Sequence, residues 1–256
     1  MSDDLREALR RLTSARLLLG RAGHALPTAA CLDLELAHAR ARDAVHRPWD
    51  HAALAAALRA EGHEVLSLAT PVHSRTEYLV RPDLGRRLDE PSAALCRKRP
   101  GADAVDVALV LSGGLSALAL DRHGFPLALT IARVLREAGL TLAPLSVIDH
   151  ARVAVGDEIG YLLGARLVVM LIGERPGLSA ADSVGLYLTF GPRPGRSDAE
   201  RNCISSIRPP EGLGYEEAAH RLRFLALEAL RRQLSGVALK DESEMLPGRA
   251  EPAQIE

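Results

Sequence analysis

The sequence contains little lysine and little cysteine, and each scarcity narrows the chemistry open to the chain. Lys98 and Lys240 are the only lysines among 32 basic residues, so a Schiff-base or activated-lysine mechanism has few candidates. Cys31, Cys96 and Cys203 are odd in number and form no C-x-x-C pair. A disulfide framework and a cysteine zinc site are therefore disfavoured, and a reducing compartment is expected.

The sequence also lacks the features of two other classes of protein. No stretch approaches the roughly 20 consecutive apolar residues of a membrane helix, and residues 1–4 lead into no apolar signal region. The formal net charge is −1, without the clustered basic excess that nucleic-acid binding requires. We therefore expect a globular protein that binds neither membrane nor nucleic acid, with room in its 256 residues for one large domain or two.

The first hundred residues are predicted to form a small, mainly helical domain. Apolar residues recur at helical spacing in three segments, over residues 3–12, 28–45 and 50–60. Thr28 and Asp50 are candidate N-caps for the second and third helices, and a strand is expected at residues 64–69. Residues 74–88 are rich in arginine, which fits a solvated loop and a partner or ligand surface equally well. A Pro-Gly pair then ends this domain, which is expected to span residues 1–100.

From residue 105 onward the pattern changes to alternating strands and helices. Strands are expected over residues 105–111, 144–148, 152–155, 167–172 and 184–190. Helices are expected over residues 115–120, 126–137, 156–163 and 215–234, with brief helices beginning at Ser179 and Ser197. This alternation predicts an α/β domain over residues 101–256, built on a Rossmann-like doubly wound sheet.

The stretch from residue 167 to residue 205 holds the first candidate site. Six consecutive apolar residues at 167–172 indicate a strand that is buried on both faces. The loop Gly173-Glu174-Arg175-Pro176-Gly177 follows and combines a shaped backbone with two charges. Because open α/β sheets bind ligands just outside the carboxyl ends of their strands, this loop is a candidate binding site.

Other motifs lack residues that a defined chemistry would require. Ser112-Gly113-Gly114 follows a strand and opens a helix, but G-x-G-x-x-G is absent, so a tight turn and a nucleotide contact both stay open. His123 has no metal-ligand spacing and is expected on an exposed connection, and no metal site is predicted. Cys203 has no neighbouring base, which favours a buried structural or ligand-contact cysteine over a nucleophile.

Several longer motifs resemble the small (light) subunit of ethanolamine ammonia-lyase. They are Arg81-Pro82-Asp83-Leu84-Gly85-Arg86-Arg87-Leu88, Leu171-Ile172-Gly173-Glu174-Arg175-Pro176-Gly177-Leu178 and Asp198-Ala199-Glu200-Arg201-Asn202-Cys203-Ile204-Ser205. Shorter matches such as Asp157-Glu158-Ile159-Gly160 lie between them, in order, from about residue 12 to residue 240. The chain departs from that family at Gly113, where an Asp is usual before Gly-Leu-Ser.

The resemblance implies one subunit of an adenosylcobalamin-dependent lyase that converts ethanolamine to acetaldehyde and ammonia. In that family a large TIM-barrel subunit carries the substrate and the catalytic residues, and the small subunit covers the cobalamin from the other side. The family's cobalamin contacts transfer to Val153, Glu174 and Cys203, and no catalytic residue is expected in this chain. The implied partner is the large subunit in a hetero-oligomer, located in the cytoplasm or within a bacterial microcompartment.

The chemistry of Glu174 is consistent with that implication. A corrin ring carries amide side chains, whose N–H groups need carboxylate or backbone acceptors. Glu174, at the end of a buried strand, can offer one, and an ion pair with Arg175 is the alternative interpretation. Two other functions stay open: a stand-alone Rossmann-type nucleotide-binding enzyme that uses residues 112–114, and a non-catalytic assembly protein whose helical N-terminal part docks onto a partner.

Overall fold

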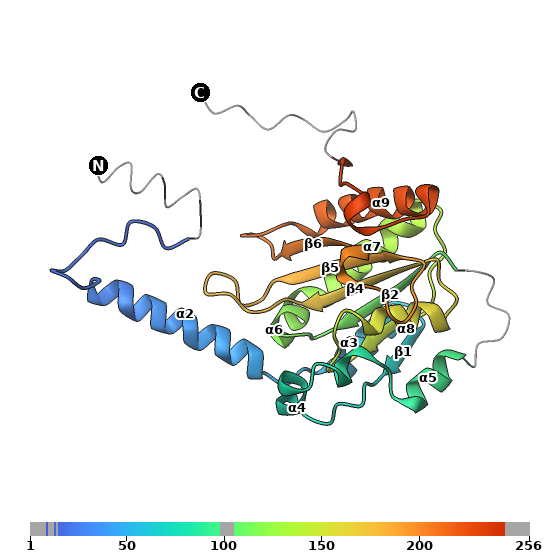
Figure 1. The fold of residues 1–256 in the computed structure, drawn as a ribbon, viewed down its shortest axis with the longest axis horizontal. Helices are drawn as coiled ribbons and strands as arrows, with labels where there is room; N and C mark the ends of the chain where they lie inside the picture. The colour runs from blue at the N-terminus through green and yellow to red at the C-terminus, as the bar shows by residue number, and fades with distance from the viewer. Residues whose placement is uncertain (1–8, 10–12, 14, 98–104, 244–256) are drawn as a thin grey trace.

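A computed structural model describes residues 9, 13, 15–97 and 105–243, which form a mixed α/β fold around one six-stranded sheet (Figure 1). The strands are β1 (Val65–Leu68), β2 (Val107–Ser112), β3 (Leu145–Ile148), β4 (Leu167–Gly173), β5 (Val184–Phe190) and β6 (Arg201–Ile207). They lie in the order β1-β3-β2-β4-β5-β6. The first four are mutually parallel, whereas β5 is antiparallel to both β4 and β6.

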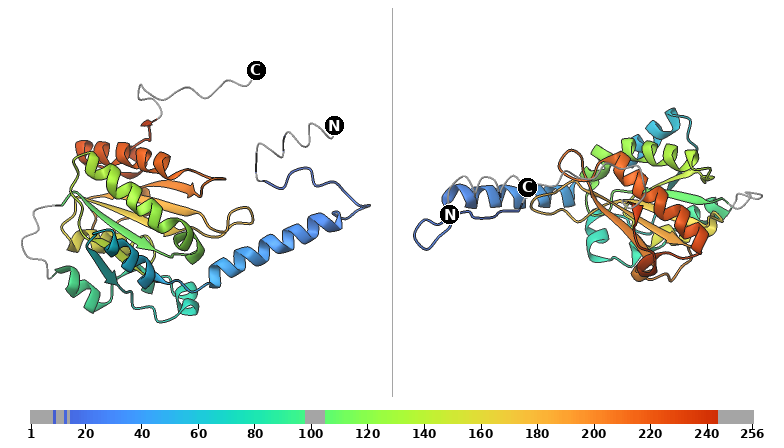
Figure 2. Two further views of the ribbon diagram at one scale, coloured as in Figure 1. Left: turned by 180° about the vertical axis from the view of Figure 1, so that it is seen from behind. Right: turned by 90° about the horizontal axis from the view of Figure 1, so that it is seen from above.

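Helices lie on both faces of this sheet. The α-helices are α2 (Thr28–His46), α3 (His51–Ala60), α4 (Arg75–Val80), α5 (Glu90–Arg97), α6 (Ala117–Ala119), α7 (Phe125–Glu137), α8 (Val155–Leu162) and α9 (Tyr215–Arg232). A π-helical turn (Leu120–Gly124) joins α6 to α7, and 3₁₀ turns lie at Leu84–Arg86, Asp198–Glu200 and Gly236–Ala238. Helices α3, α7 and α9 cover one face, which is turned toward the viewer in the left panel of Figure 2. Helices α5 and α8 cover the opposite face.

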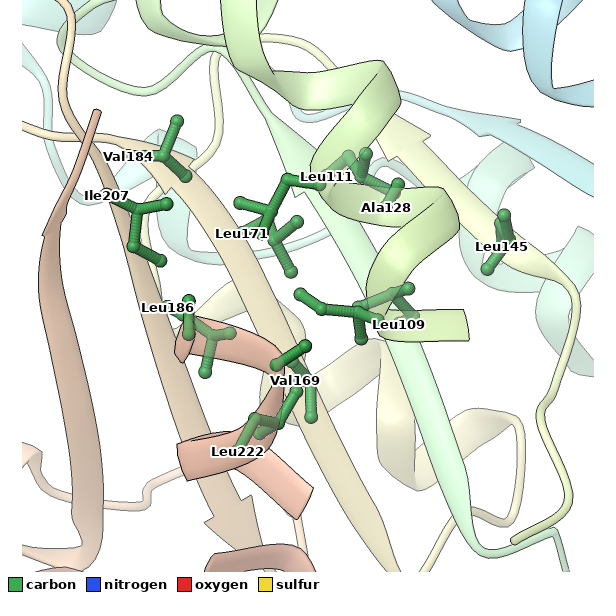
Figure 3. Packing of buried hydrophobic residues seen from close by; sticks show 14 of the residues in the cluster. Leu109, Leu111, Ala128, Leu145, Val169, Leu171, Val184, Leu186, Ile207 and Leu222 are labelled. Atoms are coloured by element: carbon green, nitrogen blue, oxygen red, sulfur yellow. The ribbon is translucent and has the colours of Figure 1, made fainter. Parts of the chain in front are cut away.

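The core consists of two apolar layers separated by the sheet. On β4, Val169 and Leu171 belong to the layer beneath α7 and α9, where Leu222 of α9 lies beside Val169 (Figure 3). The alternate residues Met170 and Ile172 belong to the second layer, beneath α8. Every residue of β2 and β4 is buried, which confirms the prediction of a strand buried on both faces at residues 167–172.

Most of the predicted elements are confirmed within a residue or two. Asp50 is the N-cap of α3, and its carboxylate accepts a hydrogen bond of 2.9 Å from the Ala53 N–H. Pro126 lies in the first turn of α7, as expected. The capping interaction at Ser197 is present, on a 3₁₀ turn. Thr28, however, is the first residue of α2 rather than its cap, a position that Pro27 occupies without a side-chain cap.

Two predicted elements are wrong, and one strand was missed. Residues 152–155 leave the sheet as a turn into α8, because the Arg152 guanidinium lies 4.1 Å from the centre of the Tyr78 ring and the Arg152 N–H bonds to the Gly85 carbonyl. Residues 179–182 form bends instead of a helix, since the Ala181 carbonyl accepts from the Ser116 hydroxyl at 2.7 Å. Strand β6 was not predicted.

The arginine-rich segment 74–88 is neither a simple solvated loop nor a wholly exposed surface. The Arg75 guanidinium donates to the carbonyls of Val45, Gly114 and Leu115 at 2.6, 2.7 and 3.0 Å, and so ties the end of α2 to the turn after β2. The helix expected at residues 3–12 and the boundary around residue 100 fall largely outside the described residues. The division into domains stays a prediction, although β1, from the N-terminal side of that boundary, pairs with β3 in the main sheet.

Candidate functional site

The three predicted binding residues lie on one face of the sheet. Glu174 directly follows β4 and continues the alternation that points Met170 toward α8. Cys203, on β6, is paired with Tyr187, which is paired in turn with Met170. Val153, just before α8, packs with Tyr187 against the same apolar layer. The fold therefore brings the three residues to a common face from separate segments of the chain.

Within the part of the chain that the structure describes, the helices cover this sheet face only in part. Helix α8 packs over β4 and β2, and α5 packs beside α8. Beyond them, the outward-facing residues Cys203 and Ser205 of β6 are exposed. On the neighbouring strand the same face presents Gly185, which has no side chain, and the half-buried Tyr187. The result is an open surface, bounded by Glu174 at the carboxyl end of β4.

Backbone contacts hold Glu174 in place at the edge of that surface. Its carboxylate accepts from the Ser206 N–H at 3.2 Å, and its own N–H donates to the Ser183 carbonyl at 3.0 Å. Ser206 can present its N–H here because it adopts a left-handed conformation with φ of 61°, next to an irregularity in the β5–β6 pairing. A Cβ at Gly185 would lie 3.0 Å from the Glu174 Oε1, so glycine leaves space for the carboxylate. Among the described residues, no ion pair joins Glu174 to Arg175.

Cys203 is chemically suited to contact rather than to nucleophilic attack. The residue is exposed on β6, which corrects the expectation that it is buried. Neighbouring atoms nevertheless desolvate the thiol and, with a smaller contribution from the Glu174 charge, raise the pKa of Cys203 despite an opposing effect of the Tyr187 hydroxyl. Burial first and the neighbouring Cys203 second raise the pKa of Tyr187 to about 12. Both groups are therefore neutral near pH 7, and a thiolate nucleophile is disfavoured.

The turn at residues 112–116 serves packing between two strands. Its Leu115 N–H donates to the Gly173 carbonyl at 3.0 Å, and its Gly114 N–H donates to the Ser112 hydroxyl at 3.3 Å. A Cβ on Gly173 would clash with the Ser116 carbonyl oxygen, so this turn rests directly on the end of β4. Because these amides are already bonded, the arrangement disfavours the alternative of a phosphate cradle.

Gly113, which stands where the resembled family usually has an Asp, lies directly against the ring of Trp49. A Cβ at this position would lie 3.1 Å from two atoms of the Trp49 ring. Trp49 is itself buried beside α3. An Asp here would require the indole to move, so the glycine and the tryptophan are physically coupled.

His123 is buried, which corrects its expected position on an exposed connection. Its Nδ1 lies 2.7 Å from the Tyr215 hydroxyl and its Nε2 lies 3.7 Å from the Asp182 carboxylate. Burial lowers the pKa of His123 despite that carboxylate. Asp182 also pairs with Arg122 at 2.6 Å and Arg208 at 3.5 Å. The part of the chain that the structure describes contains no group of three or more His, Cys, Asp or Glu side chains able to hold a metal ion.

A cleft of about 1030 Å³ lies between α2 and the loop that follows β4. Five arginines line it, together with three aspartates: Arg16, Arg40, Arg47, Arg122, Arg208, Asp33, Asp43 and Asp182. The Arg16 guanidinium bonds to the Leu178 carbonyl at 3.3 Å and connects the N-terminal segment to this loop. The loop that begins with Glu174 therefore lines the cleft through its later residues, Gly177 to Ser179. None of the three predicted binding residues lines the cleft.

Sequence reasoning did not find Gly185, Tyr187 or Ser206. For the first two a signal exists, because the alternation within Val184–Phe190 places Gly185 and Tyr187 on the same face of β5. For Ser206 there is none, since its contribution is a backbone N–H in an unusual conformation. Whether the surface binds a cofactor stays a prediction at this point.

Fold and site together define an α/β protein with a mixed sheet, one face of which the described helices cover only in part. The sequence matches the family "Ethanolamine ammonia-lyase light chain (EutC)" over residues 3–240. The chain belongs to this family, and is accordingly a subunit of a lyase. The resemblance found in the motifs is thereby confirmed.

Individual relatives agree with that assignment. An ethanolamine ammonia-lyase small subunit of Ralstonia nicotianae is 56% identical over 241 residues, which cover 93% of this chain and 89% of the relative. Those of Pseudomonas putida and Azotobacter vinelandii are each 55% identical, over 93% of this chain and 88% and 89% of the relatives. Among the described residues, no helix combines the length and apolar character needed to cross a membrane.

Proposed function

We propose that the chain is the small subunit of an adenosylcobalamin-dependent ethanolamine ammonia-lyase, which converts ethanolamine to acetaldehyde and ammonia. In this proposal it holds the cobalamin against a catalytic large subunit with a TIM-barrel fold. The observation that carries the proposal is the meeting of Val153, Glu174 and Cys203 on one uncovered sheet face. When bound, the cofactor supplies the radical chemistry through cleavage of its cobalt–carbon bond.

The residues of the surface fit such a ligand. Glu174 offers a carboxylate acceptor to amide N–H groups at the rim of the corrin, and the Ser206 N–H fixes its position. Gly185 leaves room for the Glu174 side chain and the edge of the Tyr187 ring to lie over its backbone, so both groups can face a broad flat ligand. Val153 adds an apolar contact and Cys203 a neutral thiol. The chain thus binds and orients the cofactor and excludes water from one side of it.

The connections around β2 support the finer description of the sheet as Rossmann-like and doubly wound. Helix α7 links β2 to β3 on one face, and α8 links β3 to β4 on the other. The strand order therefore reverses direction between β2 and β4, and Glu174 follows β4 at that point. Open α/β sheets bind their ligands at such positions.

Helix α2 supports the proposed assembly with a large subunit. It extends from the body as an arm (Figure 1), and only Ala37 and Ala44 of its 19 residues are buried. Leu32 and Leu36 are 59% and 49% exposed. In proteins most of the stability of a helix comes from tertiary packing of its apolar face. A partner subunit that covers these leucines would supply that packing. A cytoplasmic location, with a microcompartment as the alternative, stays a prediction.

Reconstitution tests this proposal directly. We expect no conversion of ethanolamine by the purified chain with adenosylcobalamin, because it carries no catalytic residue. Full activity is expected once the large subunit is added, and acetaldehyde formation in a coupled assay measures it. Turnover by the isolated chain, or undiminished turnover by the large subunit without this chain, would contradict the proposed division of labour.

A further inference from the structure

Tyr187 occupies the centre of the proposed binding surface. It is the residue opposite Cys203 in the β5–β6 ladder and opposite Met170 in the β4–β5 ladder. Gly185, two residues earlier on the same face, lies against the Glu174 carboxylate. A flat ligand that touches both Glu174 and Cys203 on this face must therefore pass over Gly185 and Tyr187.

The surroundings of Tyr187 leave it available to such a ligand. Helix α8 covers β4 beside it, where Gly156 faces Met170. On the other side β6 presents the exposed residues Cys203 and Ser205. Tyr187 is half-buried, so one part of its ring packs against the apolar layer beneath α8 and the rest belongs to the open surface.

We propose that Tyr187 is a further cofactor-binding residue of this site. Its ring supports the broad face of the amide-rimmed macrocycle beside Cys203, with which it is paired across the two strands. The inference rests on the proposed cobalamin-binding function and adds a contact to it. Burial raises the pKa of Tyr187 to about 12, so its hydroxyl keeps its proton near neutral pH.

The two parts of the side chain can be separated by substitution. In the reconstituted complex of both subunits, Tyr187→Ala removes the supporting ring and is expected to weaken adenosylcobalamin binding on the order of tenfold, as the loss of one aromatic contact would. Tyr187→Phe keeps the ring and is expected to bind within about threefold of the unsubstituted complex. Titration of the cofactor, followed by absorbance, measures both. Tyr161→Ala is the matched control, because Tyr161 is 61% exposed on α8.

The outcomes distinguish this inference from the function on which it rests. If Glu174→Ala weakens the titration and Tyr187→Ala does not, Tyr187 is no contact, and the proposed function stands. If both variants titrate like the unsubstituted complex, the proposed function itself fails. A loss of folding in Tyr187→Ala, visible by circular dichroism, is handled with Tyr187→Leu, which fills the space without an aromatic ring. That variant is expected to show the same weakened binding in a folded chain, and unchanged binding would overturn the proposal.

Discussion

Replacing Asp157 by alanine is expected to destabilise the chain by about 3–5 kcal/mol, because it leaves a buried arginine without its buried counter-charge. The side chains of Asp157 and Arg201 are 1% and 3% exposed. Two guanidinium nitrogens donate to the carboxylate at 2.7 Å each, and the same guanidinium also donates to the Thr189 hydroxyl at 3.1 Å. Once the carboxylate is gone, the desolvated positive charge retains the Thr189 hydroxyl, the Arg196 carbonyl and the exposed Asp198 carboxylate, which lies 3.4 Å away and is screened by solvent.

Urea denaturation of the purified chain measures this loss. The matched control is Asp83→Ala, which breaks an ion pair of the same 2.7 Å length with Arg81 on the surface. Solvent already screens that pair, so no measurable change is expected. Substituting both partners, Asp157→Leu with Arg201→Met, removes the unpaired charge and should recover most of the stability. An Asp157→Ala variant as stable as the Asp83→Ala control would show that the buried pair does not hold α8 to β6.

The position of this pair links stability to the binding surface. Asp157 lies four residues after Val153, and Arg201 lies two residues before Cys203. The pair therefore fixes α8 relative to β6, and with them two of the three predicted cofactor contacts. Partial unfolding around this pair would separate those contacts without altering either residue. We infer that the buried charges set the geometry of the surface as well as stabilise the fold.

Strands that are buried on both faces could be predicted from their runs of apolar residues. Strand β6, which has a mixed burial pattern, could not. Residues 167–172 are uniformly apolar because β4 is covered on both faces. Strand β6 is an edge strand with one open face, so its outward positions hold Cys203 and Ser205, and its inward Ile204 and Ile207 lie three residues apart. The irregular β5–β6 pairing explains that spacing, which no period-2 pattern reveals.

The candidate site was predicted through its motifs, and its supporting contacts were not. Glu174 and Cys203 stand in long stretches that resemble a known family, so their positions could be assigned from the residues alone. The contact that orients Glu174 comes from the Ser206 N–H, and every residue except proline carries such a group. The role of Tyr187 depends on the register between β5 and β6, which only the assembled sheet defines.

Replacing Glu174 by alanine is expected to weaken adenosylcobalamin binding by the reconstituted complex about 10- to 100-fold, the effect of losing a hydrogen bond to a charged acceptor. Turnover at saturating cofactor should change little, because Glu174 contacts the cofactor and takes no part in the reaction. Glu174→Gln keeps an acceptor oxygen for the Ser206 N–H and should lose less affinity. Titration by absorbance gives the affinity, and a coupled assay gives the turnover.

The fold should survive this substitution, which makes the result interpretable. Glu174 is half-buried at the end of β4, and its backbone N–H remains bonded to the Ser183 carbonyl whatever the side chain. Glu90→Ala is the control, since the Glu90 side chain is 81% exposed on α5 and pairs only with Arg97 among the described residues. If Glu174→Ala titrates like this control, the carboxylate lies outside the cofactor site. A fall in turnover at saturating cofactor with unchanged affinity would instead place Glu174 in the reaction, and would require this chain to contribute a catalytic group.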